Sequence, residues 1–480
     1  MPIDWTDSLI AFLAFAWGVY VVVLGIWVLL QKRPPEATIS WILVLGLLPY
    51  VGFFIFYFLG PQRLRKQQSK RLSNRVAMHV SDDLQALKDR AAEAPQVLRQ
   101  LAQLGTSTTG IYPCTGLAVD LLTSGAETFD AIERAIFQAR HHVHLEYYIY
   151  EPDHTGTRIR DALIQKAYQG VQVRLLVDAL GSKKLSKAFL QPLLDAGVEF
   201  ARFHDTRFGR RWRPVINYRS HRKIVVCDGR VAFTGGVNVT DEEDTRVRPD
   251  AYHDVHVRLE GNPAFWLQMV FLEDWAYANH MPLAACVAHV QDYLPVSETG
   301  PFDVQVLTSG PNNPAEPIHR TYVQAIHAAR SRVLLTTPYF VPSETAMMAL
   351  TNAALAGIDV HVLVPERSDS LMVTLAARSY YDELVAAGVK VWEYKAGMLH
   401  SKTLVIDDNF GFIGTANFDL RSFRLNYEVG VAVMGSHFNE ALSAQFQRDL
   451  RHSRRVPSHR HIPFWPRLAE AVMRLFSPML

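Results

Sequence analysis

Cysteine is scarce in this chain of 480 residues, and the three cysteines are Cys114, Cys227 and Cys286. They are widely spaced and follow no paired pattern, so we expect reduced thiols and a cytoplasmic body. The chain has 19 histidines, yet it has neither an HExxH motif nor the Cys-pair spacing typical of a zinc site. We therefore expect no metal and no other cofactor.

Charge of one sign is also lacking, because 49 Lys and Arg residues face 47 Asp and Glu residues, for a net charge of +2. Generic nucleic-acid binding needs a strongly basic face, so nucleic acid is not an expected partner. Low-complexity segments are absent as well. The part of the chain after the first runs of apolar residues, roughly 400 residues, is enough for two domains of ordinary size. Nothing in its pattern indicates an oligomeric state.

Two long apolar runs occupy the amino-terminal end, at residues 8–30 and 41–60. About 20 helical residues span the roughly 30 Å of a bilayer core, so we expect a two-helix transmembrane hairpin over residues 1–60. The first run lacks a basic amino-terminal region, which argues against a cleaved signal peptide. Buried helices of a globular domain are the other alternative, but Trp and Tyr near the ends of the runs favour a membrane interface.

Basic residues after the second run predict the orientation of this hairpin. The link between the runs has Lys32 and Arg33, whereas residues 63–75 carry six Lys or Arg residues. The positive-inside rule then predicts a cytoplasmic amino terminus, with the rest of the chain facing the inner leaflet. The same cluster can attract an anionic lipid surface, although an effect on topology alone explains it equally well.

The rest of the chain repeats itself. Residues 61–110, rich in Lys, Arg, Gln, Glu and Ala, are expected to form a basic helical linker. Helical patterns and short apolar strands then alternate in residues 111–290 and again in residues 291–480. Matching pairs are the helical patterns 129–140 and 318–330, the strands 139–150 and 329–340, and the strands 170–178 and 357–365.

These strands consist mostly of Val, Ile and Leu with little alternation, so we expect them to be buried on both sides. The predicted fold class is therefore α/β. It has two repeated domains, 111–290 and 291–480, each with a central mixed sheet flanked by helices. We expect the two domains to pack face to face.

The motif HxKxxxxD occurs twice, at residues 221–228 and 400–407. Each copy is followed, at the same distance, by a glycine turn and an asparagine. A lone His-x-Lys on a strand is usually part of a solvated face, but two copies with matching downstream residues indicate function. The candidate catalytic residues are His221, Lys223, Asp228, His400, Lys402 and Asp407.

Each motif is expected to lie on a strand that turns back in a hairpin. The His and Lys are two residues apart, so they project from one face of the strand. The motif aspartates, Asp228 and Asp407, lie at an odd distance from both and begin the turns. We expect these carboxylates to serve in the turn or as hydrogen-bond acceptors rather than as proton carriers.

Two imidazoles and two ammonium groups suit the breaking and remaking of a phosphodiester through a histidine intermediate. The lysines can hold the phosphate oxygens and offset the charge that develops in the transition state. One neutral histidine attacks phosphorus. The other, protonated, gives its proton to the leaving alcohol and later takes one from the incoming alcohol.

A second group of residues is expected to bind the phosphate or to orient the imidazoles. Two carboxylates at comparable distances after the motifs can each hold an imidazole in the useful tautomer, with a surface salt bridge as the alternative. Glycines allow a close approach of the backbone, and the asparagines can donate to the phosphate or hold a lysine. This group consists of Asp254, Glu428, Gly235, Gly236, Asn238 and Asn417.

The motif regions resemble the phospholipase D superfamily and, within it, the bacterial cardiolipin synthases. The resemblance covers nearly the whole chain, including the apolar runs. Two departures, Thr415 where the first copy has Gly236 and Cys227 at a usually aliphatic position, are expected to leave the chemistry untouched. The segments that carry the resemblance are 220–229, 233–238, 336–342, 378–381, 397–408, 414–428 and the tail 467–480.

The resemblance implies a phosphatidyl transfer between two molecules of phosphatidylglycerol in the membrane, which yields cardiolipin and glycerol. It also implies a multi-pass protein of the bacterial cytoplasmic (inner) membrane. By analogy with the family, His221 is the nucleophile and His400 the acid and base, a choice that the residues alone leave open.

Four alternatives are considered. A membrane hydrolase of the phospholipase D type differs only in using water, and another phosphatidyltransferase, including one that uses phosphatidylethanolamine, would have the same motifs. A nuclease would need no transmembrane hairpin, and a scaffold without activity would be expected to lose a motif His or Lys.

Two further segments attract attention. The loop 207–213 contains four arginines and is either a lipid headgroup contact or an ordinary solvated loop. Residues 464–480 mix aromatic and aliphatic side chains with Arg467 and Arg474. They predict an amphipathic surface helix, with a tail packed into the core as the alternative.

Overall fold

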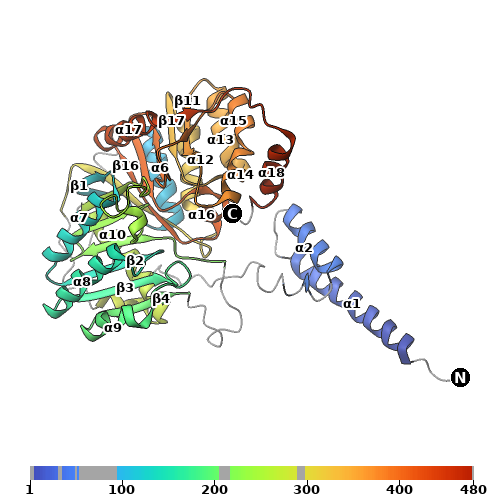
Figure 1. Cartoon of the computed structure of the whole chain (residues 1–480), viewed down its shortest axis with the longest axis horizontal. Coiled ribbons are helices and arrows are strands. Elements are labelled where there is room, and N and C mark those ends of the chain that lie inside the picture. Colours follow the sequence, from blue (N-terminus) through green and yellow to red (C-terminus); the bar gives the residue numbers. More distant parts are fainter. Residues whose placement is uncertain are drawn as a thin grey trace. The chain divides into compact units, whose positions relative to one another are not determined.

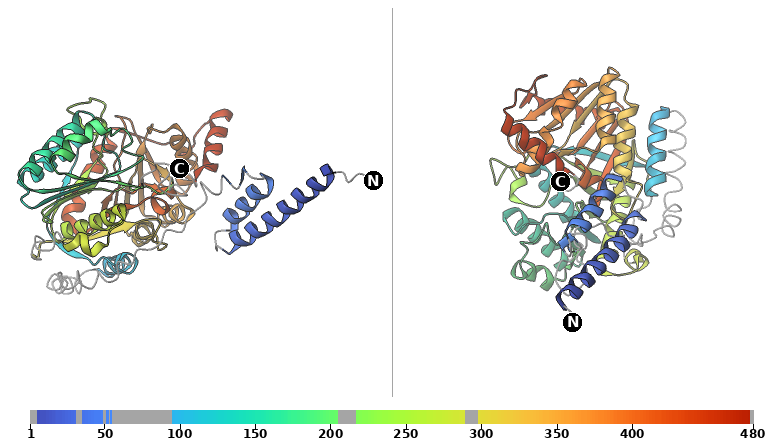
Figure 2. Two further views of the ribbon diagram at one scale, coloured as in Figure 1. Left: turned by 90° about the horizontal axis from the view of Figure 1, so that it is seen from below. Right: turned by 90° about the vertical axis from the view of Figure 1, so that its right-hand side faces the viewer.

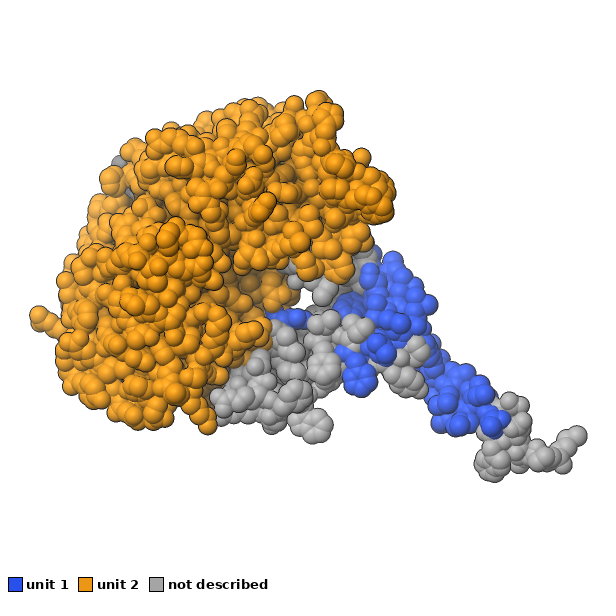
Figure 3. Space-filling view, in the orientation of Figure 1, with its two compact units in different colours: residues 1–65, 206–217 blue, residues 66–205, 218–480 orange. Residues whose placement is uncertain are grey.

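The computed structural model describes residues 5–30, 35–48, 51–52, 54, 95–204, 217–288 and 298–477. The chain divides into two compact units, residues 1–65 with 206–217 and residues 66–205 with 218–480 (Figure 3). The basic loop 207–213 and residues 61–94 of the expected linker lie outside the described residues.

The amino-terminal unit contains two apolar helices, α1 (Trp5–Leu29) and α2 (Pro35–Leu47). Val28 of α1 and Leu45 of α2 are buried against each other and their neighbours. Within the described residues, the 22-residue stretch Ser8–Leu29 is long and apolar enough to cross a membrane. The apolar part of α2, Thr38–Leu47, is shorter, and most of the predicted second span after residue 48 lies outside the described residues.

The larger unit is built on one mixed sheet of 15 strands (Figure 1). In order across the sheet, the strands are β17-β12-β11-β9-β13-β14-β16-β8-β1-β7-β6-β5-β2-β3-β4. The first half of the chain contributes β1 (Cys114–Leu122), β2 (His142–Tyr147), β3 (Gln172–Asp178), β4 (Glu199–Phe203), β5 (Lys223–Cys227), β6 (Val231–Gly235) and β7 (His256–Gly261). The second half contributes β8 (Phe302–Ser309), β9 (Arg332–Thr336), β11 (Asp359–Pro365), β12 (Lys390–Tyr394), β13 (Thr403–Ile406), β14 (Phe410–Gly414), β16 (Glu428–Met434) and β17 (Ser453–Arg455).

The strand order of the first half recurs in the second. Read outward from the middle, β1-β7-β6-β5-β2-β3-β4 corresponds to β8-β16-β14-β13-β9-β11-β12. The two halves meet where β1 pairs antiparallel with β8, with Thr115 opposite Asp303. They therefore lie side by side in one sheet (Figure 2), whereas the sequence predicted separate sheets packed face to face.

Helices cover both faces of the sheet. On one face of the first half, Val143 and Leu145 of β2 pack into a core shared with α7 and α8. On the other face, His144 of the same strand stacks on Phe271 of α10. The helices of this half are α7 (Gly125–Gln138), α8 (His154–Tyr168), α9 (Lys187–Asp195), α10 (Asn262–Asn279) and α11 (Leu283–Ala288).

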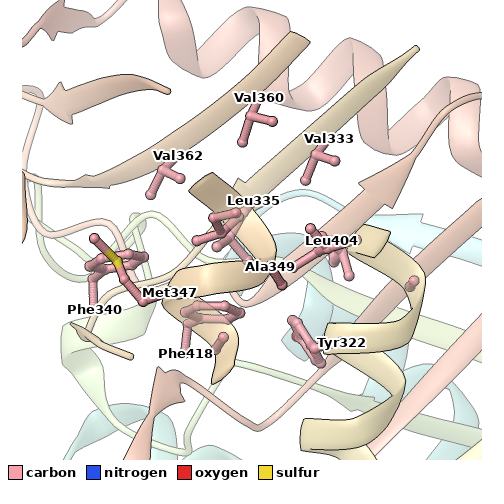
Figure 4. Packing of buried hydrophobic residues seen from close by; sticks show 14 of the residues in the cluster. Tyr322, Val333, Leu335, Phe340, Met347, Ala349, Val360, Val362, Leu404 and Phe418 are labelled. Atoms are coloured by element: carbon pink, nitrogen blue, oxygen red, sulfur yellow. The ribbon is translucent and has the colours of Figure 1, made fainter. Parts of the chain in front are cut away.

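The second half repeats this layering. Figure 4 shows Val333 and Leu335 of β9 packed with Tyr322 and Met347 from the covering helices. On the opposite face, the ring of Phe446 in α17 meets the ring of His361 in β11. The helices of this half are α12 (Pro317–Ala328), α13 (Glu344–Leu355), α14 (Leu371–Arg378), α15 (Tyr381–Ala386), α16 (Leu420–Arg424), α17 (Ser436–Leu450) and α18 (Phe464–Leu475).

Several local predictions are confirmed by this architecture. The helical patterns at 129–140 and 318–330 form most of α7 and α12, and the strands at 170–178 and 357–365 contain β3 and β11. Helix α6 (Gln96–Thr109), which lies within the expected linker, buries Leu98 and Leu101 in the core of the second half.

Candidate active site

The two motifs lie on corresponding hairpins. Strand β5 turns at Asp228 and returns as β6, and β13 turns at Asp407 and returns as β14. The hairpins are as predicted, but both histidines lie just before their strands rather than within them. This position leaves the backbone of each histidine available to the other half of the chain.

Each histidine is fixed by backbone contacts that cross between the halves. The amide of His221 donates to the carbonyl of Tyr427 at 2.9 Å, and the amide of His400 donates to the carbonyl of His253 at 2.8 Å. The two motifs, 179 residues apart along the chain (400 − 221), thus converge at the junction of the halves.

The imidazole of His221 is held by a carboxylate from the second half. Its Nδ1 lies 3.0 Å from Oε2 of Glu428, which is fully buried. Burial raises the pKa of Glu428, but the nearby His221 and Lys223 outweigh it, and the pKa lies below its usual value. The ionised carboxylate only accepts hydrogen bonds, so Nδ1 of His221 carries the proton and Nε2 is free to react.

The imidazole of His400 is held by carboxylates from the first half. Its Nδ1 lies 2.6 Å from Oδ2 of Asp254 and 3.5 Å from Oε1 of Glu243. Both carboxylates are completely buried. His400 therefore faces two carboxylates where His221 faces one, and the two imidazoles occupy different environments.

These environments move the two histidine pKa values apart. Burial lowers the pKa of His221 to about 4, because Glu428 offsets this effect only in part. Burial and Lys402 also act to lower the pKa of His400, but Asp254 and Glu243 outweigh them and raise it above its usual value. At neutral pH, His221 is neutral and His400 more readily carries a proton, which is the division of labour that acid–base chemistry requires.

Both motif lysines are buried beside the histidines. Nζ of Lys223 donates to the carbonyl of His221 at 2.9 Å, and Nζ of Lys402 donates to the carbonyl of His400. Burial and the charge of Lys402 together lower the pKa of Lys223 to about 7. The mutual repulsion of two such ammonium groups favours an anion between them.

The motif aspartates serve a different purpose. Asp228 accepts hydrogen bonds from the backbone amides of residues 140–142, at the start of β2. Asp407 accepts them from the backbone amides of residues 330–332, at the start of β9. Both begin turns with positive φ, 54° and 51°. The geometry supports the predicted role in the turn, and it does not support their inclusion among the groups that react.

The glycine turn explains why Asp254 can reach His400. A Cβ atom at Gly236 would lie only 2.1 Å from Oδ1 of Asp254, so a side chain there would displace the carboxylate. A Cβ at Gly235 would lie 2.7 Å from the backbone of His256. These two glycines allow the close approach that the sequence predicted, although it is the approach of a carboxylate and a strand.

The corresponding position in the second half is Thr415, and its hydroxyl donates to Oε2 of Glu428. Thr415 therefore contacts the carboxylate that holds His221. Thr415 thus lies within the site, and the expectation that this departure leaves the chemistry untouched stays a prediction. The sequence could not predict this hydrogen bond, because the partner of the Thr415 hydroxyl comes from the neighbouring strand β16.

The asparagines support the loops that follow the hairpins. The backbone and side-chain amides of Asn238 donate to Oε1 of Glu243, at 3.2 and 3.3 Å. The backbone amide of Asn417 donates to the hydroxyl of Ser422 at 3.2 Å. Asn238 thus holds a carboxylate rather than a lysine, and Glu243 and Ser422 occupy the same place in the two repeats.

Glu243 is a residue that the sequence reasoning missed. It lies five residues after Asn238, where the second half has Ser422 five residues after Asn417. An alignment of the two halves would have revealed this exchange of a carboxylate for a hydroxyl. Two aromatic rings were also missed: those of Tyr148 and Tyr252 lie 4.9 and 5.7 Å from the rings of His221 and His400.

One group of side chains has donor atoms close enough to hold a cation. Those of Glu243, Asp254 and His400 lie within 4.8 Å of one another. Nζ of Lys402 lies 3.9 Å from Oδ2 of Asp254, so an ammonium group already supplies positive charge beside this cluster. The expectation that no metal takes part stays a prediction.

The sequence of the chain is similar to those of known proteins. The family described as "Cardiolipin synthase, PLD-like domain" matches residues 132–247 and 322–450, and that described as "Phospholipase_D-nuclease N-terminal" matches residues 18–61. Cardiolipin synthase 1 of Bacillus cereus is 36% identical, over 98% of this chain and 95% of that protein. Cardiolipin synthase of Geobacillus kaustophilus is 37% identical, over 99% and 95%.

A solved structure shows the same fold at lower sequence similarity. The phosphatidylserine synthase of Haemophilus influenzae is 14% identical and has a TM-score of 0.58, over 79% of this chain and 100% of that one. The sequence matches extend through both motifs and nearly the full length. The chain therefore belongs to the bacterial cardiolipin synthases of the phospholipase D superfamily, a family of phosphatidyltransferases.

Proposed function

We propose that this enzyme transfers a phosphatidyl group between two molecules of phosphatidylglycerol, reversibly, to give cardiolipin and glycerol. The observation that carries the proposal is the pair of buried imidazoles, His221 and His400, each held through Nδ1 by a carboxylate from the opposite half. A buried lysine stands beside each imidazole. This set matches the needs of a phosphodiester exchange with one covalent intermediate.

The reaction begins at His221. Its Nε2 attacks the phosphorus of the first phosphatidylglycerol, and the bond from phosphorus to the glycerol oxygen breaks. His400 donates its proton to that oxygen, so glycerol leaves as a neutral alcohol. Glu428 stabilises the positive charge that develops on the imidazole ring of His221. The products of this half are phosphatidyl-His221, neutral His400 and free glycerol.

The second half reverses these steps with another alcohol. Neutral His400 takes the proton from a glycerol hydroxyl of the second phosphatidylglycerol, and that oxygen attacks the phosphorus. The bond from phosphorus to Nε2 of His221 breaks, which releases cardiolipin and restores both histidines. The pKa of His221, lowered to about 4, favours its departure as a neutral leaving group.

The phosphate is held by Lys223 and Lys402. In the free enzyme, burial lowers the pKa of both lysines, and the nearby carboxylates offset this effect in part. An anionic phosphodiester between them compensates their charge and restores protonation. The transition state gathers further negative charge on the same oxygens, so this contribution grows as the reaction proceeds.

The proposal includes the arrangement of the two domains and of the membrane anchor. Residues 111–290 and 291–480 act as two phospholipase D-like domains whose motif faces share one site. Residues 8–30 and 41–60 form a transmembrane hairpin in the cytoplasmic membrane, with the catalytic body on the cytoplasmic side. The apolar length of Ser8–Leu29 supports the first span, and the basic residues after the second support the orientation.

The proposal is tested by mass spectrometry of the lipids formed when the purified protein meets phosphatidylglycerol in mixed micelles. Cardiolipin and glycerol in equal amounts are expected, and incubation of cardiolipin with glycerol should return phosphatidylglycerol. Phosphatidic acid as the main product would instead make the protein a hydrolase. Cardiolipin formed only after addition of phosphatidylethanolamine would change the second substrate and leave the histidine chemistry in place.

A further inference from the structure

The last helix, α18, turns its apolar face away from the protein, whereas a surface helix usually buries that face. Its spacing places Trp465, Leu468, Val472 and Leu475 on one face. That face points away from the protein, and Trp465 and Leu475 are 74% and 78% exposed. A helix that packs on a globular core buries such a face, so α18 presents to its surroundings what other helices hide.

Polar contacts hold the opposite face of α18 against the body. Glu470 is buried and accepts two hydrogen bonds from Arg460, at 2.7 and 2.8 Å. Just beyond the helix, the hydroxyl of Ser477 lies 2.9 Å from that of Tyr380. The guanidinium of Arg474 stacks over the ring of Tyr380 at 4.3 Å. The orientation of α18 is therefore determined by a set of specific contacts, with its apolar face left outward.

The neighbouring helix α14 also exposes apolar side chains. This helix packs against α18, and it begins with Leu371 and Met372, which are 72% and 43% exposed. Exposed apolar surface of this kind, bordered by charged residues, marks a site for a protein or a membrane. The exposed Arg467 borders it on α18.

The α14 end of this surface lies near the active site. Asp369, two residues before Leu371, accepts a hydrogen bond from the hydroxyl of Tyr339 at 2.7 Å. Its charge acts on the buried ammonium of Lys402 and on the phenol of Tyr252. The ring of Tyr252 lies 5.7 Å from that of His400. The start of α14, which carries part of the apolar surface, thus lies near the reacting groups.

We propose that the outward face of α18, extended by Leu371 and Met372 of α14, docks on the lipid bilayer and brings the active site to the membrane surface. The inference rests on the proposed function, because its substrate is a bilayer lipid. Aromatic and aliphatic side chains enter the headgroup and acyl boundary, while the bordering Arg467 attracts anionic headgroups. Phosphatidylglycerol then moves laterally to Lys402 and His400 without leaving the bilayer.

The docking is tested on the full chain in vesicles of phosphatidylcholine and phosphatidylglycerol. Leu468→Cys is labelled with bimane, and its fluorescence is quenched with doxyl-labelled lipids; the three native cysteines are buried. The control is Tyr168→Cys on α8, a site 72% exposed in the other half, far from α18 (Figures 1 and 2). Insertion predicts quenching at least about threefold stronger at position 468 than at position 168.

A second measurement links docking to turnover. Trp465→Glu together with Leu468→Glu should lower cardiolipin formation in vesicles about tenfold and leave it within about twofold of wild type in mixed micelles, where the enzyme needs no flat surface. Tyr168→Glu should change neither. Equal quenching at the two labelled sites would overturn the docking, as would equal losses in vesicles and micelles with the fold intact.

The outcomes separate this inference from the function on which it rests. If wild-type protein makes no cardiolipin in either medium, the proposed function fails, while the quenching still decides whether α18 enters the lipid. If position 468 is unquenched but forms a disulfide between two copies, then the face is a contact between protomers, and bilayer docking is wrong.

Discussion

The carboxylate of Glu428 lies 3.0 Å from Nδ1 of His221, a residue 207 positions earlier in the chain. The reciprocal contact, between Asp254 and His400, spans 146 positions at 2.6 Å. Each half of the molecule therefore supplies one imidazole and the carboxylate for the other imidazole. Neither motif histidine takes this carboxylate from its own half, so the active site exists only when both halves fold together.

Removal of the charge that holds His221 should slow the reaction without loss of lipid binding. Glu428→Gln keeps the shape but removes the negative charge, so the imidazole loses both its tautomer and its support as positive charge develops. We expect kcat to fall about 100-fold or more, with little change in KM for phosphatidylglycerol. In a His221→Ala background the same substitution should cost nothing further, because its effect passes through that ring. An equal additional loss there would contradict the crossed pairing.

The roles of the two histidines can be separated with a leaving group that needs no proton. Phosphatidyl-p-nitrophenol releases nitrophenolate, so His400→Ala should still give a burst of about one equivalent of nitrophenolate as phosphatidyl-His221 forms. His221→Ala should give none, because no nucleophile remains. Rapid-mixing absorbance at 400 nm, about the absorption maximum of nitrophenolate, measures the burst. A burst from His221→Ala and none from His400→Ala would reverse the assignment.

Glu243 should determine the alkaline limb of the pH profile. His400 must be protonated to act as the acid, and its raised pKa means that this form is lost only as the pH rises through that higher value. Glu243→Gln removes one of the two carboxylates that raise it, so the alkaline limb of kcat/KM should move to lower pH. Glu243 also raises the pKa of Lys223, so its removal lowers that pKa as well and moves the alkaline limb in the same direction.

The acid limb provides the internal control for this variant. It reflects protonation of His221, whose pKa of about 4 is set mainly by burial and by Glu428, so it should stay in place. Ser422→Ala, at the corresponding position of the second repeat, should leave both limbs unchanged. A Glu243→Gln profile that superimposes on the wild type would show that Asp254 alone maintains the charge of His400.

The motif aspartates should matter for stability more than for chemistry. Asp407 accepts hydrogen bonds from three backbone amides and from the hydroxyl of Ser331. Asp407→Ala should therefore lower the free energy of unfolding in detergent by about 2 kcal/mol. Asp408→Ala, which removes an exposed pair with Arg332, should cost less than about 1 kcal/mol.

The pH dependence of that loss has a definite sign. The amide donors outweigh burial and hold the pKa of Asp407 below its usual value, so its contribution is present above the unfolded-state pKa. It disappears as the pH falls through the lower folded-state pKa, where wild type and Asp407→Ala should converge. Turnover per folded molecule should stay near that of the wild type. A full loss of activity in a folded Asp407→Ala protein would show that Asp407 takes part in the reaction.

Local features of this protein could be predicted from its residues because they depend on near neighbours in the chain. The apolar strands at 170–178 and 357–365, the hairpin turns at Asp228 and Asp407, and the duplicated motif all follow from short-range patterns. The resemblance of those motifs to a known family was then enough to indicate the reaction.

Tertiary structure alone decided which carboxylate meets which imidazole, and which face of α18 points outward. The pairing of Glu428 with His221 depends on the contact of two segments that belong to different repeats, and spacing within one repeat carries no information about it. The two carboxylates around His400 break the symmetry of the repeat in the same way. An amphipathic pattern likewise states only that one face differs from the other. The orientation of α18 follows from the buried contact of Glu470 with Arg460, because a charged group that leaves water must meet its partner.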